Sequence, residues 1–257
     1  MISRMSPGGL PIDGYLIRRL NNVLLYYFPN FMSLVFETLL ENRFDHKMYG
    51  LKPKHRIFQQ HPTINDSLPN RILSGTVKVK GDIERFEENG VVFKGENKVT
   101  QVDSVVFATG YQINFPYLEK RLIDPKDNKI ALYKYQYIPE LRHPHTLAFI
   151  GLIQPYGPLI PISENQARWH LQLVKGKCKP LPSLEAMQAD VAKKREALKQ
   201  RYYESKRHTM QVDVVPFMDE VSGFSVASIW LIKIRINLLR PESSGTVLLI
   251  AFASPDC

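Results

Sequence analysis

Hydrophobic positions near the start of the chain recur with the spacing of helices over two stretches, 15–28 and 31–44. Pro29 and Asn30 separate the two stretches and act as a helix breaker. The residues before them, 1–14, contain several glycines and prolines and predict a loop. From 49 to 69 the chain is polar and carries three prolines, which predicts a connecting segment.

The middle of the chain changes to the alternating or continuous apolar runs that are typical of strands. Such runs predict strands at 72–80, 91–94, 100–109 and 145–150, the second of them after a turn at Asn89-Gly90. The last two runs end directly in glycines, Gly110 and Gly151. Ligands of open α/β sheets bind at the carboxyl ends of strands, and a glycine lets them approach the backbone closely.

Two more helices follow these strands, so the pattern as a whole predicts an α/β fold. Ser163 and Gln166 have the spacing of a capping box, which predicts a helix from Ser163 to the stop at Gly176. A basic helix is expected from Leu184 to about Tyr203. Beyond it, 224–239 and 246–253 are apolar runs.

Composition places the chain among globular proteins of one large domain or two ordinary ones. It has 257 residues, of which 44% are hydrophobic and 23% charged. Its two cysteines, Cys178 and Cys257, cannot form a disulfide framework, so a reducing compartment is expected. A secretory signal is not visible, and the longest uncharged run, 20–36, is shorter than the roughly 20 apolar residues of a membrane-spanning helix.

The formal net charge of +9 favours anionic partners. The densest basic run, Lys193 to His208, is broken by Glu196 and Glu204, a mixture that is typical of a solvated helix face. The sequence contains no recognised nucleic-acid-binding motif, so no nucleic-acid partner is expected. The aromatic residues of 15–44 lie next to Arg18 and Arg19, and two interpretations stay open: a helix in a membrane interface, or a buried helix pair.

Two segments carry candidate chemistry. The run Val105 to Tyr111 is a strand ending in Thr-Gly, and 147–158 is a strand and a glycine loop followed by a helix start. A helix N-terminus presents free N–H groups and partial positive charge to an anionic or electron-rich group, and the pyrimidine edge of a flavin qualifies. On pattern alone, an ordinary strand-to-helix connection explains the second segment equally well.

The segment Phe107-Ala108-Thr109-Gly110-Tyr111 resembles a motif typical of flavin-containing monooxygenases. Further segments stand in that family's order: Tyr49 to Pro53, His61 to Asp66, Leu132 to Tyr135, Gly151 to Pro155 and Gln166 to Trp169. The resemblance extends from about Met1 to Val221 and is closest to the fifth form of the vertebrate, N-oxide-forming dimethylaniline monooxygenases.

The resemblance implies an enzyme of the endoplasmic reticulum membrane that uses FAD and NADPH. A flavin C4a-hydroperoxide would pass oxygen from O₂ to a small lipophilic amine or sulfide, or insert it next to a ketone carbonyl. The implied fold is a partial pair of Rossmann-like dinucleotide-binding domains with a helical insertion. Residues 1–103 would be the distal NADPH domain with that insertion, 104–221 the return of the chain into the FAD domain, and 222–257 a divergent tail.

The resemblance also implies which residues meet the cofactors: Thr109, Gly110, Tyr111, Gly151, Gln154 and Gln166. None of them is an acid, base or nucleophile, so no catalytic residue is assigned, and no metal site is expected. The sequence contains neither of the family's G-x-G-x-x-G motifs, and we expect a chain truncated at both ends. A catalytically inactive isoform, with open sheet edges that favour self-association, therefore stays open as the alternative.

Overall fold

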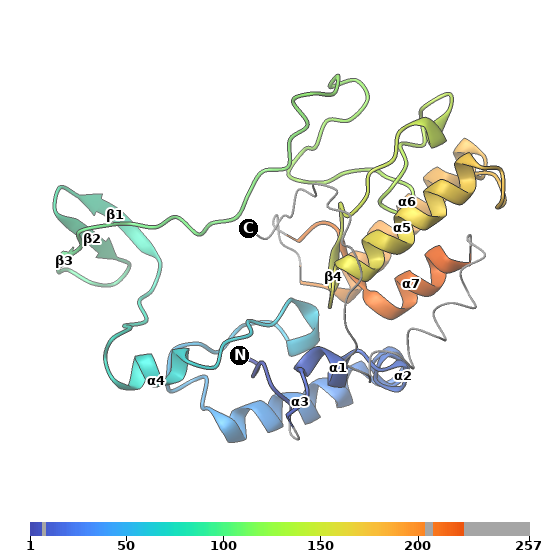
Figure 1. Ribbon diagram of the computed structural model, residues 1–257. Helices are drawn as coiled ribbons and strands as arrows, with labels where there is room; N and C mark the ends of the chain where they lie inside the picture. Colours follow the sequence, from blue (N-terminus) through green and yellow to red (C-terminus); the bar gives the residue numbers. More distant parts are fainter. Residues whose placement is uncertain (7–8, 204–207, 224–257) are drawn as a thin grey trace, which may run out of the picture. The chain divides into compact units, whose positions relative to one another are not determined.

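The computed structural model describes residues 1–6, 9–203 and 208–223, so the apolar runs predicted at 224–239 and 246–253 lie outside the described residues. The chain divides into two compact units (Figure 1). The first unit comprises Met1–Ile12 and Tyr27–Gly110, and the second comprises Asp13–Tyr26 and the chain from Tyr111 onward. The division between compact units thus falls at Gly110 and Tyr111.

The first unit combines helices with a small antiparallel sheet. Its helices are α3 (Pro29–Arg43), the short η1 (Ile57–Gln59) and α4 (Leu68–Leu73). The sheet has the order β1-β2-β3, formed by Ile83–Glu87, Gly90–Phe93 and Thr100–Gln101. Proline in the first turn of α3 fits a helix start, since its missing N–H has no intrahelical acceptor there. The predicted helix at 31–44 is confirmed.

The second unit is mainly helical. It contains most of α1 (Ile12–Leu16) and α2 (Arg19–Tyr27), and then η2 (Pro144–Thr146), α5 (Ile160–Val174), α6 (Leu184–Arg201) and α7 (Val214–Ser222). Strands β4 (Gln154–Tyr156) and β5 (Gln211–Asp213) pair in parallel. The predicted mixture of helix and sheet is therefore confirmed. Ser183 Oγ accepts a hydrogen bond from the Ala186 amide and caps α6, as expected for a helix beginning at Leu184.

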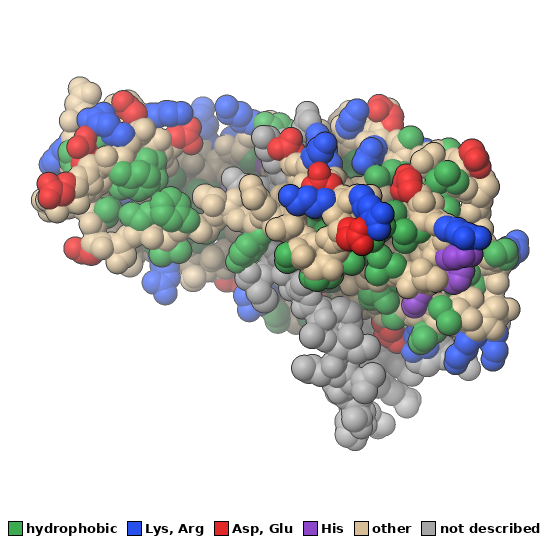
Figure 2. Space-filling view, turned by 90° about the horizontal axis from the view of Figure 1, so that it is seen from above, with side chains coloured by type: hydrophobic (Ala, Val, Ile, Leu, Met, Phe, Trp, Pro, Cys, Tyr) green, Lys and Arg blue, Asp and Glu red, His purple; other side chains and the backbone are tan. Residues whose placement is uncertain are grey.

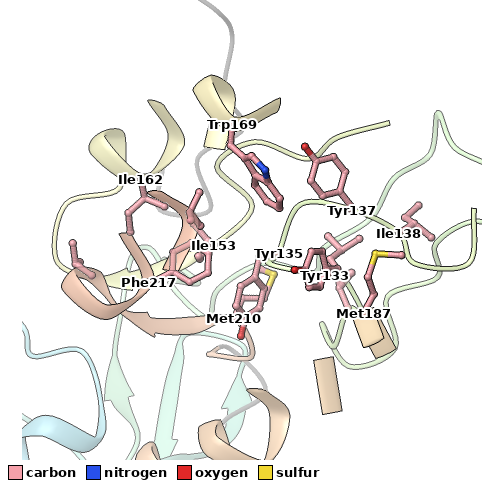
Figure 3. Close-up of a cluster of buried hydrophobic side chains, with 14 residues drawn as sticks. Tyr133, Tyr135, Tyr137, Ile138, Ile153, Ile162, Trp169, Met187, Met210 and Phe217 are labelled. Carbon is pink, nitrogen blue, oxygen red and sulfur yellow. The ribbon is translucent and has the colours of Figure 1, made fainter. Parts of the chain in front are cut away.

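The core of the second unit is built from aromatic and aliphatic side chains of α5, α7 and the segment 130–138 (Figure 3). Trp169 is 1% exposed and Tyr137 is fully buried, and their rings meet edge to face with centroids 5.0 Å apart. Ile153, Ile162 and Phe217 gather beside them. Such aromatic contacts add to the burial of apolar surface that stabilises a domain of this size.

Three of the four predicted strands are wrong in whole or in part, and the reasons are local. Asn65 Oδ1 accepts hydrogen bonds from the amides of Ser67 and Leu68, which begins α4 and turns the start of the predicted 72–80 strand into helix. Pro144 begins a 3₁₀ turn inside the predicted 145–150 strand, where only Ala148 forms an isolated bridge, to Tyr137. The strand at 91–94 is confirmed as β2.

The predicted strand at 100–109 is reduced to Thr100–Gln101. The rest of the run is extended and exposed, with Val106 87% and Phe107 71% accessible. A continuous apolar strand is stable only between neighbouring strands, and within the described chain β2 pairs only with Thr100 and Gln101 of this run. Figure 2 shows hydrophobic side chains gathered on the surface of the region that carries β1 to β3. The rings of Phe86 and Phe107, both exposed, have centroids 6.1 Å apart.

Candidate functional site

The loop that begins at Gly151 joins the buried core to strand β4 and forms the centre of the candidate site. Gly151 adopts a left-handed backbone with φ of 80°, which favours glycine. Its amide donates to Gln166 Oε1 at 3.0 Å, and Gln166 Nε2 donates to the Lys134 carbonyl at 3.4 Å. Gln166 is fully buried, so both ends of its amide are used inside the protein and fix the loop against α5.

The hydrogen bonds continue from Gln166 into the core. Gln136 Nε2 donates to the Gln166 carbonyl at 3.0 Å and to Tyr137 Oη at 3.2 Å. Tyr137 Oη in turn lies 3.2 Å from His170 Nδ1. Burial raises the pKa of the Tyr137 phenol and, together with the nearby His145, lowers the pKa of His170, so neutral forms of both are favoured. This network gives the loop a rigid support.

Strand β4 continues from the loop and carries Gln154. The Gln154 amide donates to the Met210 carbonyl at 2.9 Å, and Gln154 stands opposite Gln211 in the parallel pair β4-β5. Gln211 is 2% exposed, and neither atom of its side-chain amide has a hydrogen-bond partner within the described structure. Sequence reasoning missed Gln211, because a lone glutamine in a short polar segment carries no periodic signal.

The N-terminus of α5 differs from the capping-box prediction, which is wrong. The helix begins at Ile160, three residues before the predicted Ser163, with a proline in its first turn and no side-chain cap. Ser163 therefore lies inside the helix, buried, and its hydroxyl donates to the Leu159 carbonyl at 3.2 Å. Proline in the first turn fixes a helical φ, and this early start outweighs the capping preference of serine.

The remaining predicted residues lie where the chain passes from the first unit to the second. Thr109 and Gly110 end the first unit, both are exposed, and Gly110 has a left-handed φ of 88°. Tyr111 begins the second unit, and its carbonyl accepts a hydrogen bond from Asn128 Nδ2 at 3.0 Å. Asn128 Oδ1 also accepts from the Ile113 amide at 2.7 Å, so one side chain holds this stretch.

The structure thus brings Gly151 and Gln166 into direct contact and places Gln154 on the strand that follows. Tyr111 belongs to the same unit as these three residues, whereas Thr109 and Gly110 belong to the other. Within the described residues no group of three or more His, Cys, Asp or Glu side chains could hold a metal ion.

The second unit therefore defines a mixed α/β protein in which the Gly151 loop leads into strand β4 and is held against α5 by Gln166. The chain belongs to the flavin-binding monooxygenase-like family, whose model matches residues 1–241. It is 44% identical to flavin-containing monooxygenase 5 of Mus musculus over 93% of this chain. It is 38% identical to the N-oxide-forming dimethylaniline monooxygenase 2 of Rattus norvegicus over 86% of this chain.

These matches confirm the resemblance to the family and to its fifth form. The chain spans 43% of the mouse protein and 41% of the rat protein. Among solved structures, the S-allyl-L-cysteine S-oxygenase of Allium sativum aligns with 55% of this chain and 32% of its own, at a TM-score of 0.45 and 26% identity.

Proposed function

We propose that this chain is part of an NADPH-dependent, FAD-containing monooxygenase that oxygenates small lipophilic nucleophiles. Amines and sulfides are the expected substrates, with oxygen insertion next to ketone carbonyls as the further outcome, and O₂ is the co-substrate. Membership of the flavin-binding family supports this function. Among the residues themselves, the observation that supports this function is the buried hydrogen bond from the Gly151 amide to Gln166. This bond holds the Gly151 loop against α5.

The residues fit a flavin by chemistry. Flavin rings are bound through backbone N–H and carbonyl groups and amide side chains, and the bound flavin supplies the activation of oxygen. Gln154, Thr109, Gly110 and Tyr111 would contact the cofactors in this proposal. Gly151 would shape the loop, because its amide donates to Gln166 and its carbonyl accepts a hydrogen bond from the Ile153 amide. Gln166 is a positioning residue, because its amide is already used to hold Gly151 and the Lys134 carbonyl.

Titration of the purified chain with FAD tests cofactor binding. The expected result is a shift of the flavin absorbance bands and quenching of flavin fluorescence, both saturable. With NADPH and an amine or sulfide present, substrate-dependent oxidation of NADPH is expected. A chain that leaves the flavin spectrum unchanged at every protein concentration would refute the proposal for this polypeptide.

The second candidate is a catalytically inactive form of the same family. It is favoured by the sequence, which contains no G-x-G-x-x-G motif for dinucleotide phosphates, and by the exposed apolar surface with Phe86 and Phe107. This candidate predicts no NADPH oxidation and self-association that grows with concentration. Sedimentation velocity together with the flavin titration separates the two candidates, since only the first predicts a flavin-bound species.

We further propose peripheral contact with the endoplasmic reticulum membrane through residues 15–44. Helices α2 and α3 leave large apolar side chains exposed, namely Leu20, Val23, Tyr26, Tyr27, Phe31, Leu34 and Leu39. No described helix alone combines the length and apolar character of a membrane span, and α2 and α3 meet that test only as a broken pair. Aromatic and aliphatic side chains on an exposed helix favour the interface of a bilayer.

Co-sedimentation with phosphatidylcholine vesicles measures this contact. The change Phe31→Ser should reduce the bound fraction several-fold, because it removes a large apolar group from the contact. Phe86→Ser is the matched control, since Phe86 is also exposed but lies outside residues 15–44. Equal loss for both variants would argue against a contact through this segment.

A further inference from the structure

The segment 104–108 of the first unit is an apolar stretch that no strand of the described chain pairs with. It follows closely on β3, which stands at one end of the order β1-β2-β3 and so has an unpaired edge within the described residues (Figure 1). In that part of the chain, no backbone amide or carbonyl of 104–108 forms a hydrogen bond. Unpaired backbone groups beside a sheet edge favour pairing with a strand of another chain.

The side chains of this segment leave a large apolar surface accessible. Val105, Val106 and Phe107 are all exposed, within a stretch from 101 to 112 in which every residue is exposed. Phe86 of β1 is exposed as well, and its ring lies beside that of Phe107. Contiguous exposed apolar groups of this kind mark an interaction site.

The sequence of the segment suits a second copy of itself in antiparallel orientation. With Val106 at a two-fold axis, Val105 of each copy stands opposite Phe107 of the other, and Ser104 stands opposite Ala108. Valine and phenylalanine are favoured in strands, and a pair of a β-branched and an aromatic side chain across two strands is stabilising. Because side chains alternate between the faces of a strand, both of these pairs share one face.

Charge favours the antiparallel orientation over a parallel one. Asp103 precedes the segment, and a parallel pair in register would place the two Asp103 carboxylates side by side, which is unfavourable. In the antiparallel pair the two carboxylates lie at opposite ends. The segment 104–108 itself contains neither a charged residue nor a proline, which are the residues that commonly protect an edge strand from pairing with its own copy.

The accessible area sets the strength of such a contact. The side chains of 104–108 together with Phe86 present on the order of 500 Å² per copy, so that a pair buries roughly 1,000 Å². This area lies at the lower limit of specific interfaces, which predicts a reversible dimer and not an obligate one. A two-fold contact uses the same surface on both copies, so association stops at the dimer.

We propose that two copies of this chain form a closed dimer through antiparallel pairing of the segment 104–108. Phe107 of each copy packs against Val105 of the other, and the backbone groups of the two segments satisfy one another. The pair ends before Thr109 and Gly110, so it does not use the cofactor contacts proposed above. The dimer is independent of the monooxygenase function, because it requires neither flavin nor substrate.

Sedimentation equilibrium of the full chain over a range of concentrations tests this dimer. The parent should fit a monomer–dimer equilibrium without larger species. Val106→Lys should weaken the dimer at least about tenfold, because it places two like charges opposite each other at the axis. The side chain of Val106 is 87% exposed, so the change should leave the fold of the monomer intact.

Leu73→Lys is the matched control for this variant. Leu73 is 73% exposed and ends α4 in the same unit, outside the segment 104–108, so its replacement should leave the dimer unchanged. A parent that stays monomeric, a series of ever larger species, or equal weakening by the two variants would overturn the proposal.

Cysteine crosslinking locates the axis. In a background with Cys178→Ser and Cys257→Ser, Val106→Cys should form a disulfide-linked dimer under mild oxidation, because the residue at the axis meets its own copy. Ser104→Cys should not, since its two copies lie about 13 Å apart along the pair, beyond the reach of a disulfide. An equal mixture of the Ser104→Cys and Ala108→Cys chains should link again. Equal linking by Val106→Cys and Ser104→Cys would refute the proposed pairing.

Discussion

Lys194 Nζ lies 2.6 Å from Glu220 Oε2, and this ion pair ties the middle of α6 to α7. The other carboxylate oxygen of Glu220 accepts a hydrogen bond from Lys134 Nζ, which also donates to Asp190 Oδ1 at 2.5 Å. The Lys134 side chain is 5% exposed. Lys134 follows directly on Tyr133 in a buried turn, and its carbonyl accepts a hydrogen bond from Gln166, the residue that holds the Gly151 loop. These ion pairs therefore connect that turn to the two helices α6 and α7.

Replacing Glu220 by glutamine should destabilise the second unit by about 1 to 3 kcal/mol, because the change leaves the buried Lys134 with one carboxylate fewer. The lower part of this range is expected, since Glu220 itself is one-third exposed. Urea unfolding followed by circular dichroism measures the change. Glu164→Gln is the control: it breaks the exposed pair with Arg168 and should cost less than about 0.5 kcal/mol. Equal shifts of the two midpoints would contradict the role given to the buried cluster.

The same carboxylate predicts an acid-sensitive contribution to stability. Burial raises the pKa of Glu220, but Lys194 and Lys134 more than offset this, so its pKa in the folded protein lies below the ordinary 4.5. The unfolded chain then takes up the proton first as the pH falls, and the contribution is complete above about 4.5 and disappears below it. The difference in unfolding free energy between the parent and Glu220→Gln should therefore shrink from pH 6 to pH 3. A constant difference would show that Glu220 does not act through its charge.

The helices were more predictable than the strands because their signals are local. Pro29 marks the start of α3 and Ser183 caps α6, and each acts through its own neighbours. The run at 100–109 has the composition of a buried strand, yet a strand exists only if another strand pairs with it. Within the described chain β2 pairs with only two residues of the run, so Val106 and Phe107 stay exposed.

The candidate site was predictable in the same partial way. A glycine at the end of an apolar run identified Gly151, whose left-handed φ bears out the need for glycine. The side chain that holds it, Gln166, was singled out as a capping residue, and the actual contact joins positions 15 residues apart through the core. Lys134, Asp190 and Glu220 come together only in the folded unit, and their spacing along the chain carries no pattern.

The Gly151 loop should depend on Gln166 for its stability. Gln166→Ala leaves the Gly151 amide and the Lys134 carbonyl without these partners in a buried place, and we expect a loss of about 1 to 3 kcal/mol in unfolding free energy. Gln172→Ala, on the same helix but partly exposed, is the matched control and should stay within about 0.5 kcal/mol of the parent. Thermal and urea unfolding both report the change, and similar losses for the two variants would remove the special role of Gln166.

The sheet of the first unit offers an equally sharp test at Gly90, where β2 begins opposite β3. A Cβ at this position would collide with the Thr100 carbonyl oxygen and lie 2.6 Å from Val99 Cγ1. Since backbone cannot move aside without losing the β2-β3 pairing, Gly90→Ala should destabilise the sheet by about 1 to 3 kcal/mol. Amide hydrogen exchange over Gly90–Phe93 should accelerate accordingly. At Gly81 the nearest atom to an added Cβ is 4.0 Å away, so Gly81→Ala should leave that exchange unchanged, and equal acceleration in the two variants would contradict the close approach of β2 and β3.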